Sequence, residues 1–331
     1  MRRDGRAVAG IAIAAGIGAL ALVPILFAKA FLVTLLIFVG IYVIVCTGLS
    51  LIFGYAGQLS LTQAAFYGIG AYASALGTLR LGLPFWAGLA AAALLPAAVA
   101  WVIGRPILRL RHFYLAMATL AFSEICAVFF VQEVDITGGP TGITHVPPAS
   151  LFGWKLDTPE RYYYLVLLIA GAVVLFSANL IRSKYGRALR AISDNETAAL
   201  AMGVDVAATK NAMFVLSAAY AGIGGALYAH FVSFVNPDPF SVSLSVLLVI
   251  MVAVGGVKSL WGAVLGAVFI TVLPTLLGTW RQYAMLVYGI VLVLALMFMP
   301  DGIAGVGAAI LRRIRGRSAT DEPGGTRTAT P

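Results

Sequence analysis

The sequence predicts an all-α protein, a polytopic bundle of transmembrane helices. Of its 331 residues, 61% are hydrophobic and only 11% are charged, whereas soluble domains carry about 25% charged residues. A soluble fold of this length needs more polar surface than this composition supplies. The apolar residues form long continuous runs without the alternation of barrel strands. In lipid, only helices and closed barrels can form all their backbone hydrogen bonds internally, so these apolar runs are predicted to be helices.

Charges and Gly/Pro clusters divide the chain into apolar segments of about the 20 residues that a helix needs to cross the hydrocarbon. We expect about ten membrane segments, at residues 7–28, 31–53, 60–79, 83–104, 113–132, 162–181, 211–235, 241–255, 259–279 and 283–299. The first follows Arg2, Arg3 and Arg6 and ends at the small-x-small pattern around Lys29. It is therefore either a retained helix or a removed signal peptide, and its length favours a retained helix.

The predicted organisation is one membrane domain, residues 1–311, followed by a tail at 312–331. The tail begins basic and continues in Gly, Thr and Pro, which bury too little to fold, so we expect it to be disordered. With a cytoplasmic N-terminus, most of the 22 Lys and Arg residues fall in cytoplasmic segments. The positive-inside rule therefore predicts both termini in the cytoplasm. No basic-aromatic stripe accompanies the net charge of +9, so nucleic acid is excluded as a partner.

The pattern G-x-x-S-L-x-x-A occurs twice, at residues 57–64 and 256–263, each time in a Gly-rich break between apolar segments. Interrupted helices at matching positions of two halves indicate an internal repeat and a translocation pathway. Irregular backbone is tolerated at membrane depth only inside protein or beside a cavity. The alternative is that both are simple turns rather than re-entrant helices. The candidate pathway residues in these breaks are Gly57, Gln58, Ser60, Gln63, Gly256 and Ser259.

The longest cytoplasmic loop, residues 182–210, contains the signals of a short rigid helix. Ser193, Asp194, Asn195 and Glu196 fit a capping box, and Gly203 suits the left-handed position that ends a helix. Asp205 is placed to cap the helix that follows. The short helix rests either on lipid or against a partner protein. Its small side chains and acidic start favour a protein partner over an interfacial anchor.

Two further features are candidates for function. Glu124 lies near the middle of segment 113–132, where a charge is costly. It either lines the pathway, meeting a substrate ammonium there, or is hydrogen-bonded and holds helices together. In the outer loop 133–161, Gly138, Gly139 and Pro140 form either a plain turn or a gate and docking point. Cysteines and histidines do not cluster, so no metal or other cofactor is expected.

Four stretches of the chain resemble the LivM-type permeases of ATP-binding cassette (ABC) importers for branched-chain amino acids. These stretches are Gly48–Tyr72 (GLSLIFGYAGQLSLTQAAFYGIGAY), Ile136–Ile143 (ITGGPTGI), Gly186–Ser241 (beginning GRALRAISDNETAALAMGVD) and Val254–Ala267 (VGGVKSLWGAVLGA). They occur in the family's order and cover most of the chain from Gly48 to Ile303.

The resemblance implies a transport subunit of the bacterial inner membrane that is not itself an enzyme. Its partners would be a sister permease, two cytoplasmic ATPase subunits, a periplasmic binding protein, the amino acid substrate and membrane lipid. The sequence also resembles the family's E-A-A-x-x-x-G coupling pattern, with Thr197 where Glu is typical and Glu196 one place earlier. The ATPase-coupling residues implied are Ser193, Asp194, Glu196, Thr197, Ala198, Ala199 and Gly203.

Other functions remain as alternatives. Related permeases carry urea, short amides or other amino acids. A secondary transporter would need ion-coupling carboxylates or histidines deep in several spans, and only Glu124 qualifies. A membrane enzyme would need clustered catalytic groups, and none is visible. The glycines before Lys258 do not form a phosphate-binding loop, because Val257 precedes the lysine and an apolar span precedes the glycines.

Overall fold

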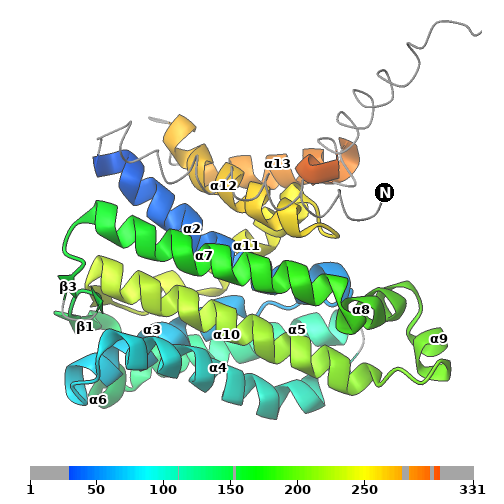
Figure 1. Cartoon of the computed structure of the whole chain (residues 1–331), viewed down its shortest axis with the longest axis horizontal. Helices are drawn as coiled ribbons and strands as arrows, with labels where there is room; N and C mark the ends of the chain where they lie inside the picture. The colour runs from blue at the N-terminus through cyan, green and yellow to red at the C-terminus, as the bar shows by residue number, and fades with distance from the viewer. Residues whose placement is uncertain (1–29, 111, 152–153, 278–282, 299–301, 306–331) are drawn as a thin grey trace, which may run out of the picture.

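The computed structural model describes residues 30–110, 112–151, 154–277, 283–298 and 302–305 (Figure 1). Within them the protein is all-α, as predicted. The longer helices are α2 (Ala30–Ser50), α3 (Gln63–Arg80), α4 (Phe85–Ile107), α5 (His112–Gln132), α7 (Pro159–Arg182), α8 (Lys184–Asp194), α10 (Val206–Val232), α11 (Val242–Gly255), α12 (Leu260–Leu277) and α13 (Ala284–Phe298). The shorter ones are η1 (Leu51–Tyr55, a π-helix), α6 (Val134–Thr137), η2 (Gly139–Thr141), α9 (Glu196–Ala201) and η3 (Asp238–Phe240).

Each apolar segment predicted from residue 31 onward coincides with a helix, but ten spans are not confirmed. Among the described residues, five helices are long and apolar enough to cross a membrane, or six if α11 and α12, bent by 119°, form one span. α3 is not among them, because Gln63 and Arg80 at its two ends, with Ser74 and Thr78 between them, lower its mean hydropathy. α13 is only 15 residues long. The predicted segment 7–28 and the tail 312–331 lie outside the described residues.

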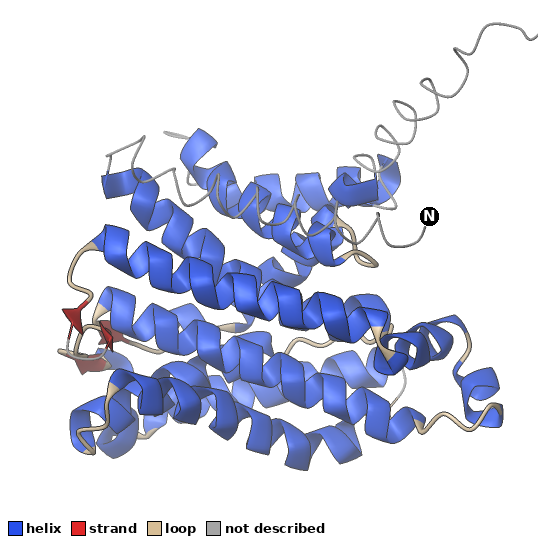
Figure 2. Cartoon of the chain, viewed as in Figure 1, coloured by secondary structure: helices blue, strands red, loops and turns tan. Residues whose placement is uncertain are grey.

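The short elements gather at the two ends of the bundle (Figures 1 and 2). At one end, which we call the β end, β1 (Ile143–Thr144) pairs antiparallel with β4 (Phe234–Val235), with Ile143 opposite Val235. There too β2 (Ser150–Leu151) pairs with β3 (Trp154–Lys155), and α6 lies nearby. Helices α8 and α9 project at the opposite end, which we call the α8–α9 end.

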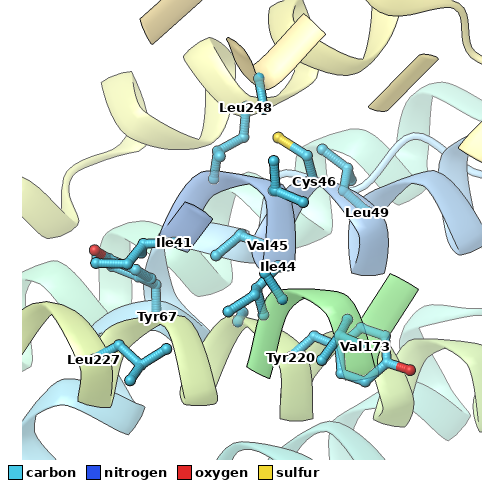
Figure 3. Packing of buried hydrophobic residues seen from close by; sticks show 14 of the residues in the cluster. Ile41, Ile44, Val45, Cys46, Leu49, Tyr67, Val173, Tyr220, Leu227 and Leu248 are labelled. Carbon is cyan, nitrogen blue, oxygen red and sulfur yellow. The ribbon is translucent and has the colours of Figure 1, made fainter. Parts of the chain in front are cut away.

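Glycines bring the central helices α3, α4 and α10 into backbone contact. A Cβ added at Gly225 of α10 would overlap the carbonyl oxygen of Tyr67 in α3, and one at Gly222 would overlap that of Ala92 in α4. Small residues are typical at helix contacts in membranes because they let backbones approach closely. On a neighbouring face, α2 packs its branched side chains against α10 and α11, as Figure 3 shows for Ile44, Leu227 and Leu248.

Candidate functional site

The first predicted break is a non-helical segment, residues 56–62, that joins η1 to α3. It begins at the α8–α9 end, where Gly57 lies beside Ser193 of α8: an added Cβ would be 3.6 Å from the Ser193 Oγ. It ends near the middle of α10, where the Gln63 Nε2 donates to the Ser217 Oγ at 2.8 Å. The segment therefore carries non-helical backbone from one end of the bundle into its centre.

Side chains from two other helices satisfy this backbone. The Leu61 N–H donates to the Thr119 Oγ1 at 3.2 Å, and the Ser123 Oγ donates to the Leu61 carbonyl at 2.7 Å. The Ala64 N–H, one of the unpaired donors in the first turn of α3, donates to the Ser245 Oγ at 3.0 Å. Both polar groups of Leu61 are thus paired by α5, and α11 supports the start of α3. An interrupted span in lipid requires such pairing.

Three predicted pathway residues line this segment and are buried. Gln58, Ser60 and Gln63 are 7%, 2% and 0% exposed, and the Ser60 and Thr62 hydroxyls share a hydrogen bond of 2.9 Å. The Oε1 atoms of Gln58 and Gln63 have no hydrogen-bond partner among the described residues. A buried amide oxygen without a partner costs about 1–3 kcal/mol. The first break therefore contains two buried amide oxygens that can still accept a hydrogen bond.

The second predicted break is a tight turn between α11 and α12. Gly256 has a φ of +126°, and added Cβ atoms at Gly255 and Gly262 would overlap backbone carbonyls, so the turn requires glycine. Ser259 caps α12, since its Oγ accepts from the Gly262 N–H at 3.3 Å. Gly54 of η1 packs directly on the Val257 carbonyl. The turn therefore adjoins η1, the element that leads into the first break.

The two breaks adjoin, but they are not alike. Residues 56–62 form a longer non-helical segment, partly buried and bonded to α5, whereas residues 256–259 form a compact turn. The shared pattern G-x-x-S-L-x-x-A therefore gives two different local structures, and an internal repeat is not confirmed. The physical difference is the partner of each serine: Ser60 bonds a neighbouring hydroxyl, while Ser259 caps a helix.

Glu124 lies on the exposed face of α5, with Ile125 and Val128 beside it at 66% and 49% exposure. It forms no hydrogen bond or salt bridge with any residue that the structure describes. The preceding residue, Ser123, points the other way and holds Leu61. Of the two interpretations of Glu124, a hydrogen bond joining helices of this chain therefore receives no support.

Helices α8 and α9 correct one sequence prediction and confirm two others. Ser193 and Asp194 do not start a helix; they lie in the last turn of α8. Asn195, in an extended conformation, caps α9 instead, and its Oδ1 accepts from the Ala198 N–H at 3.0 Å. The capping box was wrong because helical backbone continues through Asp194. Gly203 has the predicted left-handed φ of +79°, and Asp205 caps α10 at 2.9 Å.

A salt bridge attaches α9 to α10. The Lys210 Nζ lies 2.7 Å from the Glu196 Oε2, and the lysine is only 7% exposed. Ala199 is buried against Ile192 of α8 and Val206 of α10. Of the predicted coupling residues, Thr197 and Ala198 are exposed and Ala199 faces inward. Leu200 and Met202 add exposed apolar surface, at 55% and 83%. The α9 helix is thus fixed on one side and free on the other.

The predicted gate at the β end is a closely bonded turn. Gly138 and Gly139 have φ values of +76° and +58°, and a Cβ at Gly138 would overlap the Gly142 carbonyl. The Thr137 Oγ1 accepts from the Gly139 N–H at 3.2 Å, and Pro140 is exposed. Gly138 and Gly139 are therefore required by the conformation of this turn, which other residues adopt less easily. Whether a partner docks on this turn stays a prediction.

Several polar residues that hold this site together were missed from the sequence. They are Thr119, Ser123, Ser217, Ser245, Lys210 and His230. For all but Lys210, which lies at the end of the predicted loop 182–210, the sequence signal is a polar residue inside an apolar segment. His230 is the clearest example: its Nδ1 donates to the Pro147 carbonyl at 2.7 Å, and its Nε2 bonds the Ser74 hydroxyl at 2.8 Å. It ties the β end to α3 and α10.

Among the described residues, no group of three or more His, Cys, Asp or Glu side chains is placed to hold a metal ion. The described residues form a bundle of apolar helices that includes a non-helical segment with paired backbone and a short helix projecting from one end. These features are typical of a polytopic membrane protein.

The chain belongs to the family described as "Branched-chain amino acid transport system / permease component", whose model matches residues 31–296. It is 36% identical over 286 residues to the high-affinity branched-chain amino acid transport system permease protein LivM of Escherichia coli, covering 80% of this chain and 67% of that protein. It is 27% identical to a probable LivM of Methanocaldococcus jannaschii, covering 81% and 92%. It is 26% identical to LivH of Salmonella typhimurium, covering 80% and 91%. No solved structure matches significantly.

The bonds from α5 to Leu61 lead to a first prediction. Replacing Thr119 by Val and Ser123 by Ala leaves both polar groups of Leu61 unpaired in the bundle, at a cost of about 1–3 kcal/mol each. We expect the thermal unfolding midpoint of the purified protein in detergent to fall. Thr271→Val is the control: its hydroxyl is buried without a partner, so its loss should leave the midpoint unchanged or raised. Equal midpoints for the double variant and the control would refute the role of α5.

Proposed function

We propose that this chain is the membrane-spanning permease subunit of an ABC importer for branched-chain amino acids. The observation that carries the proposal is the α9 helix, fixed to α10 on one side and exposed on the other, in a member of this permease family. ATP hydrolysis would take place in two separate cytoplasmic subunits, and a periplasmic binding protein would deliver the substrate. A sister permease completes the pathway, which is supported by similarity to both LivM and LivH proteins.

In this proposal the α8–α9 end faces the cytoplasm of a bacterial inner membrane, as do both chain termini. Support comes from the basic residues at that end, including Arg105 of α4, Arg109 just after α4, and Arg187 and Arg190 of α8. Cytoplasmic segments of membrane proteins are enriched in Lys and Arg. About ten membrane segments then result, with residues 7–28 as the first and α3, α11, α12 and α13 each counted.

We infer that α9 receives the motion of an ATPase subunit and passes it on by two contacts. Thr197, Ala198, Leu200 and Met202 form the exposed surface on which the ATPase would dock. The Glu196–Lys210 salt bridge links α9 to the central helix α10. At the end of α8, Ser193 lies beside Gly57, near the start of the non-helical segment 56–62. A displacement of the α8–α9 pair would therefore reach both a packed helix and the break.

The translocation pathway would run along the break and α5. In the conformation described here, Gln58 and Gln63 are buried, as in a closed state, and their unpaired oxygens would be freed when the segment moves. Gly57 and Gly256, both with positive φ, would absorb the backbone changes. Gly138, Gly139 and Pro140 at the β end would meet the periplasmic binding protein.

Glu124 would line the half of the pathway that this chain shares with its sister permease. An unpaired carboxylate at mid-span does not face lipid, since a charge there costs about 2.5–3.5 kcal/mol or more. An amino acid substrate is zwitterionic, and its ammonium group would bind the Glu124 carboxylate in this pathway. Urea and short amides carry no such charge, so Glu124 favours an amino acid as the substrate over these alternatives.

The energy source distinguishes this proposal from a secondary transporter. Cells carrying the complete importer should continue leucine uptake when the proton gradient is collapsed and ATP is maintained, because ATP hydrolysis drives transport. Uptake should stop with an ATPase subunit that binds but does not hydrolyse ATP. Uptake that disappears with the proton gradient alone would indicate a carrier and contradict the proposal.

The Glu196–Lys210 pair gives a test of coupling. In proteoliposomes with the assembled importer, we expect Lys210→Met to lower the amount of leucine transported per ATP hydrolysed. Exchanging the charges, Glu196→Lys with Lys210→Glu, should restore part of that ratio. Lys184→Met, which removes an exposed lysine from α8, is the matched control and should have no effect. An unchanged ratio in Lys210→Met would exclude this contact from coupling.

Glu124→Gln tests the pathway assignment. With saturating, substrate-loaded binding protein, we expect leucine uptake to fall about tenfold, as loss of roughly 1.4 kcal/mol of charge interaction predicts. ATP hydrolysis stimulated by the binding protein should continue, and Glu124→Asp should retain most uptake. Glu133→Gln, an exposed glutamate just beyond α5, is the control. Normal uptake in Glu124→Gln would mean that the carboxylate does not meet the substrate.

A further inference from the structure

A groove of about 830 Å³ lies at the α8–α9 end, between the ends of α4 and α7 and the first half of α10. Its walls are mainly apolar, formed by side chains such as Trp101, Phe176, Leu180 and Leu216. At Gly104 and Asn211 the helices α4 and α10 touch, because a Cβ on Gly104 would overlap the asparagine side chain. The contact between α4 and α10 therefore forms the floor of the groove, and the groove opens to the outer surface of the bundle.

The depth of the groove matches one leaflet of a bilayer. Its lining on α10 extends from Asp205 to Ala219, which corresponds to about 21 Å at 1.5 Å per residue. A bilayer with its headgroup regions is about 40–45 Å thick, so one leaflet is about 20–22 Å. The groove is therefore long enough to hold a lipid of one leaflet, with the headgroup at the α8–α9 end and the acyl chain toward Ala219.

The charged groups of the groove are all at its headgroup end. Arg105 and Arg109 are exposed there, and neither forms a salt bridge within the described ranges. The third charged residue, Asp205, uses its Oδ1 to cap α10. The Arg105 guanidinium stacks over Trp101 at 4.2 Å from the ring centre, and tryptophan is typical of membrane interfaces. The mouth of the groove is therefore positive, and guanidinium groups bind phosphate oxygens well.

We propose that this groove binds one anionic phospholipid. Its phosphodiester would lie between Arg105 and Arg109, and an acyl chain would follow Phe176, Leu180 and Leu216 toward Ala219. A water-soluble protein would not follow an apolar groove this far into the bilayer. The lipid would brace α4 against α10, the helix that carries Lys210. Basic pockets between helices on the cytoplasmic side commonly hold anionic headgroups, and the proposal requires only that this end faces an anionic leaflet.

Lipid retention by the purified full-length chain tests the proposal. The protein would be equilibrated with equal amounts of phosphatidylglycerol and phosphatidylcholine in detergent and examined by native mass spectrometry. We expect one retained phosphatidylglycerol in the wild type and at least about tenfold less in Arg105→Gln/Arg109→Gln. Arg187→Gln/Arg190→Gln removes the same charge from α8, outside the groove, and should retain the lipid as the wild type does.

Two further measurements separate a lipid site from an anion site. Ala219→Phe fills the deep end of the groove while keeping both arginines, and we expect it to lose phosphatidylglycerol as well. Millimolar inorganic phosphate should not displace the lipid. The proposal is overturned if both arginine pairs retain lipid equally, if phosphatidylcholine is retained as well as phosphatidylglycerol, or if phosphate alone competes. None of these readouts depends on transport, so they are independent of the proposed importer function.

Discussion

The constraint on which this structure depends is that backbone N–H and C=O groups must be paired wherever water is absent. Residues 56–62 leave helical geometry inside the bundle, so they cannot satisfy their own polar groups. Thr119 and Ser123 therefore bond both groups of Leu61, and Ser245 takes the N–H of Ala64. The positions of α5 and α11 around α3 follow from this requirement as much as from apolar packing.

The same segment joins the two ends of the proposed mechanism. Its first residues adjoin α8, and its last bond to Ser217 in α10, the helix that α9 holds through Lys210. In the proposed mechanism, a displacement of α9 would be passed to α10. Because glycines of α10 leave no space between its backbone and those of α3 and α4, these helices would have to move with it. A rigid path of this kind transmits displacement better than a chain of flexible side chains.

Apolar length and local helix signals predicted the helices of the apolar segments from residue 31 onward, the stop at Gly203 and the cap at Asp205, since each depends on residues close in sequence. They did not predict α8, which lies in the segment read as a loop. Long-range pairing was not predictable. Nothing near Ser217 or Ser245 indicates that they serve residues 63 and 64. Ser193 shows the same limit locally: the pattern Ser-Asp-Asn-Glu offers two caps, and only the path of α8 decides that Asn195 is used.

One of the reasons that ten spans are not confirmed, the polarity of α3, bears on how the bundle is packed. α3 contains Gln63, Ser74 and Thr78, and the partners of the first two are Ser217 and His230. A helix that carries such groups is too polar for lipid on all sides, and it is stable because other helices surround it. Two of the polar residues of α3, Gln63 and Ser74, are thus those that bond it to α10. Low apolarity in one helix of a membrane protein is therefore a sign that other helices surround it.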